Sequence, residues 1–191
     1  MKQPSFPPFR VLFAHDLILR RAQELARHVH LATAPEPPML VAVIEGARPF
    51  ARLMQKFVPG GLPVHEVRAQ SYVGTKSSGQ VQITMGADLP VGSRHVLLLE
   101  DIVDTGRTIA ALQQHFLRRG AKSCRVASLL SKPSRRVVPV TIDFLGFEIP
   151  DEFVLGFGMD LDGRYRELPD IVVYEAEIER AFQAQSAAAR A

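Results

Sequence analysis

Residues 96–108 read VLLLEDIVDTGRT, and this stretch decides how the rest of the chain is interpreted. The apolar run at 97–99 is typical of a strand buried on both faces of a sheet, whereas residues 108–117 have helical periodicity. The turn between them therefore lies at the carboxyl end of a strand, the edge where open α/β sheets bind ligands. A helix that begins at Thr108 directs free backbone N–H groups at an anion, and Gly106 lets the backbone approach that anion closely.

Three carboxylates precede this turn: Glu100, Asp101 and Asp104. They would repel a bare phosphate, so they suit sugar hydroxyls, a proton, or Mg²⁺ held through water. Asp104 can face a heterocyclic base as a proton acceptor. The simpler alternative is a solvated acidic loop with a helix cap at Thr105 or Thr108. The position of the cluster between an apolar strand and Thr-Gly-Arg-Thr favours a site for a phosphorylated sugar.

The remaining chain alternates between strand and helix patterns. Helices are predicted over 16–30, 49–57, 108–117 and 177–191, and strands over 39–44, 62–68, 81–84, 97–99 and 126–130. The apolar positions of the first helix are Leu17, Ala22, Leu25, Ala26 and Val29. Strands that alternate with helices require right-handed parallel crossovers. The predicted fold class is therefore α/β, a doubly wound, mainly parallel sheet flanked by helices.

Length and composition indicate the class of protein. A chain of 191 residues with 47% hydrophobic and 23% charged residues fits one globular domain, residues 1–191, with its core over residues 11–174. Apolar runs stay well below the roughly 20 residues of a membrane span, and the N-terminal segment does not resemble a secretory signal, so a cytoplasmic protein is expected. The single cysteine, Cys124, is interpreted as a small buried hydrophobe.

The formal net charge of +3 is spread thinly along the chain. Because no basic stripe with interleaved aromatic residues occurs, nucleic-acid binding is not predicted. A modest positive field instead suits small anionic substrates. The densest basic point, Arg135-Arg136, remains without an assigned role.

Three further motifs accompany residues 100–108. Ser71-Tyr72 precedes a Gly/Ser/Thr-rich loop, Lys132 follows Leu-Leu-Ser, and residues 143–154 read DFLGFEIPDEFV. In this order the four motifs resemble the hypoxanthine-guanine phosphoribosyltransferase family of purine phosphoribosyltransferases. The resemblance implies Mg²⁺-dependent transfer of a 5-phosphoribosyl group from phosphoribosyl diphosphate to a 6-oxopurine, hypoxanthine or guanine, in purine salvage. It also implies a homodimer or homotetramer.

The resemblance further implies roles for residues at the phosphoribosyl end of the site. The 5-phosphate would be anchored by Thr105, Gly106, Arg107 and Thr108, and the ribose hydroxyls by Glu100 and Asp101. The metal would be held by Glu100, Asp101 and Asp160. The diphosphate would contact Gly46, Ser71, Tyr72 and Arg166.

At the purine end, the resemblance implies that Asp104 accepts the proton of N7 and that Lys132 donates to the oxygen at C6. A single donor at that position discriminates against adenine, which presents an amino group there. Phe153 would stack on the base and the backbone of Val154 would bond to its edge. The alternative for Phe153 is plain core packing.

Two segments are expected to cover the site. Residues 70–80 are too polar and glycine-rich to pack as core, and the resemblance favours a mobile lid that closes over phosphoribosyl diphosphate rather than an ordinary solvent loop. Residues 141–157 contain short β segments broken by Gly146, Pro150 and Gly156, and they are expected to form part of a small hood over the base.

One position departs from the family pattern. Glu45 stands before Gly46 where members of the family often place a lysine. The resemblance implies a cis peptide between Glu45 and Gly46, whose backbone N–H would serve the diphosphate. Arg48 is expected to compensate part of the misplaced negative charge.

Two alternatives to this function remain. The chain could be a regulatory homologue that binds a nucleotide to control nucleic-acid binding, or an enzyme with xanthine or pyrimidine specificity. The presence of Asp104, Lys132, Asp160 and Arg166 favours catalysis, and the missing basic stripe disfavours the regulatory interpretation.

Overall fold

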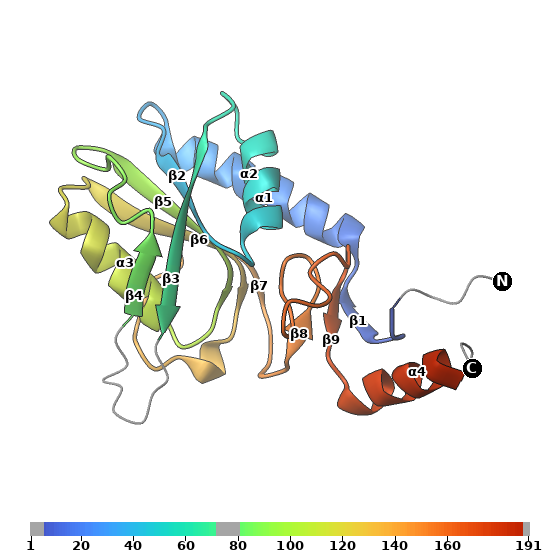
Figure 1. The fold of residues 1–191 in the computed structure, drawn as a ribbon. Helices are drawn as coiled ribbons and strands as arrows, with labels where there is room; N and C mark the ends of the chain where they lie inside the picture. Colours follow the sequence, from blue (N-terminus) through green and yellow to red (C-terminus); the bar gives the residue numbers. More distant parts are fainter. Residues whose placement is uncertain (1–5, 72–80, 189–191) are drawn as a thin grey trace.

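The computed structural model describes residues 6–71 and 81–188, which form two β-sheets and flanking helices (Figure 1). The larger sheet has the strand order β4-β3-β2-β5-β6-β7, and the smaller sheet has the order β1-β9-β8. The strands are β1 Arg10–Phe13, β2 Met39–Val43, β3 Val64–Ser71, β4 Val81–Met85, β5 His95–Val103, β6 Ser123–Ser131, β7 Phe144–Glu148, β8 Val154–Leu155 and β9 Ile171–Val173. The helices are α1 His15–Thr33, α2 Arg48–Phe57, α3 Arg107–Arg118 and α4 Ala176–Ala188, with a 3₁₀ turn, η1, at Pro133–Arg135.

The larger sheet is mainly parallel. The β2–β3, β2–β5, β5–β6 and β6–β7 pairs all run parallel, and β4 pairs antiparallel with β3 at one edge. α1 and α2 pack on one face, and α3 packs on the other. The predicted α/β class is therefore confirmed.

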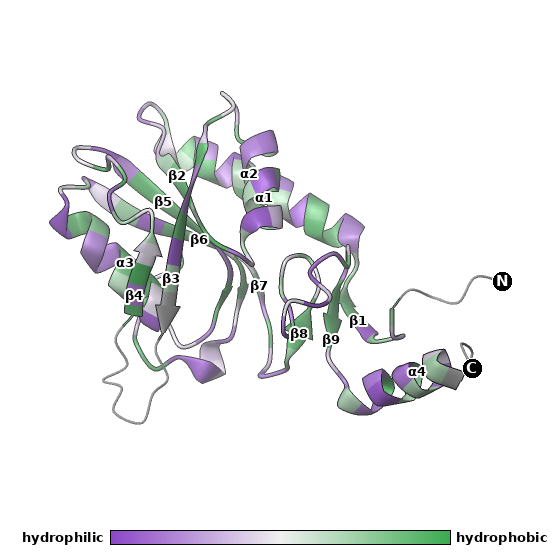
Figure 2. Ribbon diagram, in the orientation of Figure 1, coloured by the Kyte–Doolittle hydropathy of each residue, from purple (hydrophilic) through white to green (hydrophobic). Residues whose placement is uncertain are grey.

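Successive side chains of β5 point to opposite faces of the sheet, so the strand contributes to two separate apolar clusters. Leu97 and Leu99 belong to the apolar cluster beneath α1 and α2, whereas Val96 and Leu98 belong to the cluster beneath α3. Figure 2 shows the hydrophobic central strands between helices that carry both kinds of residue. Burial on both faces explains why this strand has a continuous apolar run instead of an alternating pattern.

One of the five apolar positions predicted for α1 differs from the structure. Its buried positions are Ile18, Ala22, Leu25, Ala26 and Val29. Leu17, which was predicted to face the core, is 39% exposed. Ile18 fits the 3.6-residue period of the other four positions, which places Leu17 at the solvent boundary.

Of the helices that the structure describes, not one has the length and apolar character needed to cross a bilayer.

The strand predicted over residues 62–68 is shifted toward the C-terminus. β3 continues through Gln70 and Ser71, which pair with Gln82 and Val81 of β4. These two residues were predicted to begin the mobile loop, and that boundary is wrong because β4 supplies backbone partners for them. The rest of the predicted lid, residues 72–80 with Tyr72, lies outside the described residues.

The predicted hood segment, residues 141–157, divides between the two sheets. Phe144–Glu148 forms β7 and pairs with β6 as an edge strand of the larger sheet, so its assignment to the hood is wrong. Only Val154–Leu155 joins the smaller sheet, where it pairs with β9. The third strand of that sheet is β1, from near the N-terminus. The two sheets meet where the rings of Phe13 and Phe147 stack with centroids 4.2 Å apart.

Cys124 at the start of β6 packs against the α3-side cluster. Burial raises the pKa of its thiol to about 12. The thiol is therefore protonated near neutral pH and unsuited to nucleophilic chemistry, which agrees with its interpretation as a small hydrophobe.

Two adjacent residues of α3 provide a test of this core. Phe116 is fully buried, whereas Leu117 is 48% exposed. We expect Phe116→Ala to lower the free energy of unfolding by about 3–5 kcal/mol, because it removes a buried ring and leaves a cavity. Leu117→Ala, the matched control, should change it by less than about 1 kcal/mol. Urea unfolding followed by circular dichroism measures both, and equal effects would contradict the packing of α3.

Candidate active site

A cleft of about 520 Å³ opens at the carboxyl edge of the larger sheet, where the smaller sheet meets it. Its walls come from the end of β5, the turn after β6 and the segment around β8. The lining residues are Asp101, Ile102, Asp104, Lys132, Arg135, Asp151, Phe153, Val154, Met159 and Asp160. Six of the residues predicted from the sequence are therefore brought into one cleft: Asp101, Asp104, Lys132, Phe153, Val154 and Asp160.

Glu100 and Asp101 lie at the end of β5, and burial raises the pKa of both carboxyls. Asp101 Oδ1 accepts a hydrogen bond of 2.9 Å from the Ile102 backbone N–H. Glu100 Oε2 is buried and has no hydrogen-bond partner among the described residues. An unpartnered buried carboxylate oxygen needs a donor or a cation, and neither is supplied by the surrounding side chains.

Glu100, Asp101 and Asp160 do not form a complete metal site by themselves, but they suit Mg²⁺ that also binds water and substrate. No cluster of three or more His, Cys, Asp or Glu side chains close enough to hold a metal occurs within residues 6–71 and 81–188. Glu100, Asp101 and Asp160 are thus not a preassembled cage. Asp101 and Asp160 line the same cleft, and Glu100 keeps a free oxygen. Mg²⁺ commonly keeps several waters and is held by one or two carboxylates plus substrate oxygens, so this donor set suits it.

The turn 105–108 connects the cleft to α3. The helix begins at Arg107, one residue before the predicted start, and Gly106 precedes it with φ of 84°. The N-cap residue, Gly106, has no side chain to cap the helix. The Arg107 N–H donates a long hydrogen bond of 3.4 Å to Thr105 Oγ1, and the N–H groups that follow it in the first turn are available to an anion. The Thr105 carbonyl accepts from the backbone of Val137 and Val138, at 3.0 and 2.9 Å. This pairing holds the turn in place before a ligand arrives.

Gly46, after β2, packs directly on the acidic motif. A Cβ at this position would overlap the Asp101 carboxylate, and a Cβ on Gly158 would overlap the Gly46 carbonyl. The cis peptide of this segment joins Ile44 to Glu45. The predicted position of that bond, between Glu45 and Gly46, is therefore wrong by one residue.

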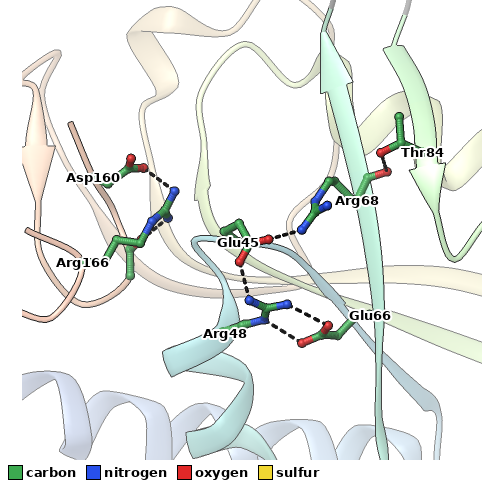
Figure 3. A network of polar contacts seen from close by, with 8 residues as sticks. Glu45, Arg48, Glu66, Arg68, Thr84, Asp160 and Arg166 are labelled. Carbon is green, nitrogen blue, oxygen red and sulfur yellow. Dashed lines mark hydrogen bonds and ion pairs between the residues drawn. The ribbon is translucent and has the colours of Figure 1, made fainter. Parts of the chain in front are cut away.

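The Glu45 carboxylate is enclosed by arginines, as Figure 3 shows. Its two oxygens pair with Arg48 and Arg68. Arg48 also donates to both oxygens of Glu66, at 2.8 and 3.0 Å, and these hydrogen bonds hold the pKa of Glu66 below its usual range. Arg48 thus compensates Glu45 as expected, and Arg68 is a second partner that the sequence did not indicate.

At the part of the cleft predicted to bind the purine, Lys132 follows β6 and is 8% exposed, with Nζ 3.8 Å from Asp151. Phe153 is 51% exposed although it is a large aromatic residue, so core packing does not explain it. Val154 is buried in β8. An exposed ring and a buried ammonium group that line the same cleft can contact a flat polar heterocycle at its face and at its edge.

Arg135 is a site residue for which the sequence suggested no role. Its Nε lies 3.2 Å from Asp104, and its Nη1 lies 3.5 Å from Asp151. In the sequence, the feature that could have indicated a role is its position three residues after Lys132. The structure places it in the 3₁₀ turn η1. Its neighbour Arg136 points elsewhere and donates to Ser131 Oγ at 2.7 Å.

The side chains of Asp160 and Arg166, both in the segment between β8 and β9, point toward each other (Figure 3). Their side chains pair at 2.8 Å, and Arg166 also donates to the Gly158 carbonyl at 2.6 Å. Asp160 accepts a further hydrogen bond from the Gly163 N–H at 2.6 Å. Of the predicted diphosphate contacts, Ser71 ends β3, and Tyr72 is not among the described residues.

Substitution of Gly46 tests the packing on Asp101. We expect Gly46→Ala to lower the free energy of unfolding by about 1–3 kcal/mol, because the new methyl group must displace a buried carboxylate. Gly92→Ala is the matched control, since the nearest heavy atom to its Cβ would lie 3.9 Å away. Thermal unfolding of both variants measures the difference, and a Gly46 variant as stable as the control would refute the contact.

Comparisons with known proteins agree with this geometry. Residues 11–162 match the phosphoribosyl transferase domain family. The chain is 37% identical to a hypoxanthine-guanine phosphoribosyltransferase of Streptococcus thermophilus over 170 residues, which cover 88% of this chain and 94% of the relative. It is 38% identical to that of Streptococcus pneumoniae with the same coverage. A crystal structure of a hypoxanthine phosphoribosyltransferase from Staphylococcus aureus superposes with a TM-score of 0.83 at 30% identity, covering 88% of this chain and 92% of that one. The chain therefore belongs to the phosphoribosyltransferase family, and within it to the hypoxanthine-guanine phosphoribosyltransferases.

Proposed function

We propose that this chain transfers the 5-phosphoribosyl group of phosphoribosyl diphosphate to a ring nitrogen of hypoxanthine or guanine, in purine salvage. The products are a nucleoside monophosphate and diphosphate. The observation that carries the proposal is the placement of Asp104, Lys132 and Phe153 in the same cleft as Asp101 and Asp160. That cleft combines partners for a purine with partners for a hydroxylated, metal-bound sugar.

The phosphoribosyl end is bound by the turn before α3. Backbone N–H groups of residues 105–108 donate to the 5-phosphate, and the helix dipole adds a positive potential there. The Arg107 side chain and the threonine hydroxyls supply further donors. Glu100 and Asp101 accept from the ribose hydroxyls, which gives carboxylates a use beside an anion that they would otherwise repel.

The purine end is bound between Lys132 and Phe153. The Lys132 ammonium donates to the C6 oxygen, while the Phe153 ring stacks on the base and the Val154 backbone bonds to its edge. Asp104 accepts the N7 proton as the bond to the sugar forms. Arg135 contacts one Asp104 oxygen at 3.2 Å, which leaves the second oxygen available to the base.

The leaving diphosphate is bound by Arg166, by the Gly46 backbone, and by Ser71 and Tyr72. Arg166 presents a planar guanidinium suited to phosphate oxygens. Asp101, Asp160 and Glu100 would hold Mg²⁺ directly or through water, and the metal would neutralise the charge that develops on the diphosphate. We further propose a cytoplasmic homodimer or homotetramer, as the family resemblance implies.

Asp104→Asn tests the proton acceptor. The substitution preserves the shape of the side chain and removes its basicity, so turnover on hypoxanthine should fall about 100-fold or more. Binding of phosphoribosyl diphosphate should persist, because Asp104 serves the base. Steady-state kinetics and calorimetric titration with phosphoribosyl diphosphate measure the two effects. Turnover close to that of the unmodified protein would exclude Asp104 as the base.

A panel of bases tests the specificity. Hypoxanthine and guanine should react and adenine should be nearly inert, because the Lys132 donor meets an amino group on adenine. Lys132→Ala should raise KM for the purine about tenfold or more while KM for phosphoribosyl diphosphate changes little. The same assay with xanthine and uracil separates the alternative specificities. Comparable turnover on adenine refutes the argument, and no turnover on any base favours the regulatory interpretation.

A further inference from the structure

α4 is anchored to the smaller sheet through a buried acid, Glu179. Its residue exposure is 5%, whereas Glu177 on the same helix is exposed. A buried carboxylate is costly unless hydrogen bonds compensate it, and Glu179 has several. Its oxygens accept from Tyr165 Oη at 2.7 Å, from Tyr174 Oη at 2.8 Å, from Gln183 at 3.2 Å and from Arg164.

The Tyr174 arm of this network leads to the purine end of the cleft. The Tyr174 ring packs edge-on against Phe153, with centroids 5.8 Å apart and an interplanar angle of 72°. The Tyr174 N–H also donates to the Phe153 carbonyl at 2.8 Å. Phe153 lines the cleft and is half exposed, so the Tyr174 ring supplies packing that orients it.

The hydrogen bond from Tyr165 to Glu179 connects the network to Arg166 and Asp160. Tyr165 has φ of 74°, a left-handed conformation that is unfavourable for a bulky residue, and its neighbour is Arg166. Surrounding contacts must hold this conformation. The hydroxyl of Tyr165 is bonded to Glu179, and its ring packs against Phe9 with centroids 5.5 Å apart. Arg166 in turn pairs with Asp160, which lines the cleft.

We propose that Glu179 is a positioning residue for the active site: through Tyr174 it orients the ring that stacks on the purine, and through Tyr165 it holds the segment that carries Asp160 and Arg166. The inference rests on the proposed transfer reaction and adds a residue of α4 to it. Phe9 packs against both tyrosine rings, at 5.5 and 5.8 Å between centroids, so the two arms share one aromatic support. A carboxylate that only fastened α4 would not need partners on both routes to the cleft.

Single-hydroxyl deletions separate the two arms kinetically. Tyr174→Phe should raise KM for hypoxanthine about three- to tenfold and leave KM for phosphoribosyl diphosphate within about twofold. Tyr165→Phe should produce the reverse pattern. Glu179→Gln, which preserves side-chain size, should raise both KM values, and the control Glu177→Gln should change neither. If Glu179→Gln does not fold, the two tyrosine variants still test the inference. Equal effects of both tyrosine variants on both KM values, or a lowered Tm with unchanged KM values, would overturn it.

Amide exchange of the protein without substrates tests the same inference independently of turnover. Tyr174→Phe should accelerate exchange of the backbone N–H at position 174, which donates to the Phe153 carbonyl. Tyr165→Phe should accelerate exchange over residues 158–166. The Glu177→Gln control should match the unmodified protein. Lack of transfer by the unmodified protein would refute the proposed function, whereas exchange equal to the control in both tyrosine variants would refute the role of Glu179.

Discussion

The carboxyl edge of the larger sheet depends on the contact between the Gly46 backbone and the Asp101 side chain. Because Gly158 packs against the Gly46 carbonyl, three segments meet there with no space for a methyl group. These segments follow β2, end β5 and follow β8. The contact therefore holds the acidic motif close to the segment after β8 that carries Asp160.

The charged side chains that line the cleft, apart from Asp101, form ion pairs in the described structure. Asp104 and Asp151 share Arg135, Asp160 pairs with Arg166, and Lys132 lies near Asp151. The two pairs of Arg135 join side chains that are about half exposed. Exposed ion pairs are worth about 0–1 kcal/mol, so a charged substrate can replace these two at little cost. Glu45 is also paired locally. Arg48 and Arg68 neutralise its charge, so that its carboxylate need not face the diphosphate.

The sequence predicted the parts of this protein in which local pattern and structure coincide. The apolar run of β5 and the turn before α3 follow from patterns within short segments. The joint placement of Asp104, Lys132 and Phe153 follows instead from the family resemblance, since local pattern alone left core packing open for Phe153. The smaller sheet was not predictable in the same way, because β1 and β9 are far apart in the chain and each is too short to show a period. The aromatic network of Glu179 is hidden for a similar reason, since its partners come from two separate segments.

The smaller sheet pairs Arg10–Phe13 with Ile171–Val173, so the first strand of the chain is completed by the last. All six strands of the larger sheet precede β8 in the chain. During synthesis the larger sheet can therefore assemble before β9, the partner of β1, has been made. The wall that carries Phe153 forms only after β9, Ile171–Val173, has left the ribosome, because β8 pairs with it. A chain truncated before β9 would therefore lack the support of β8 and Phe153, even if its larger sheet is complete.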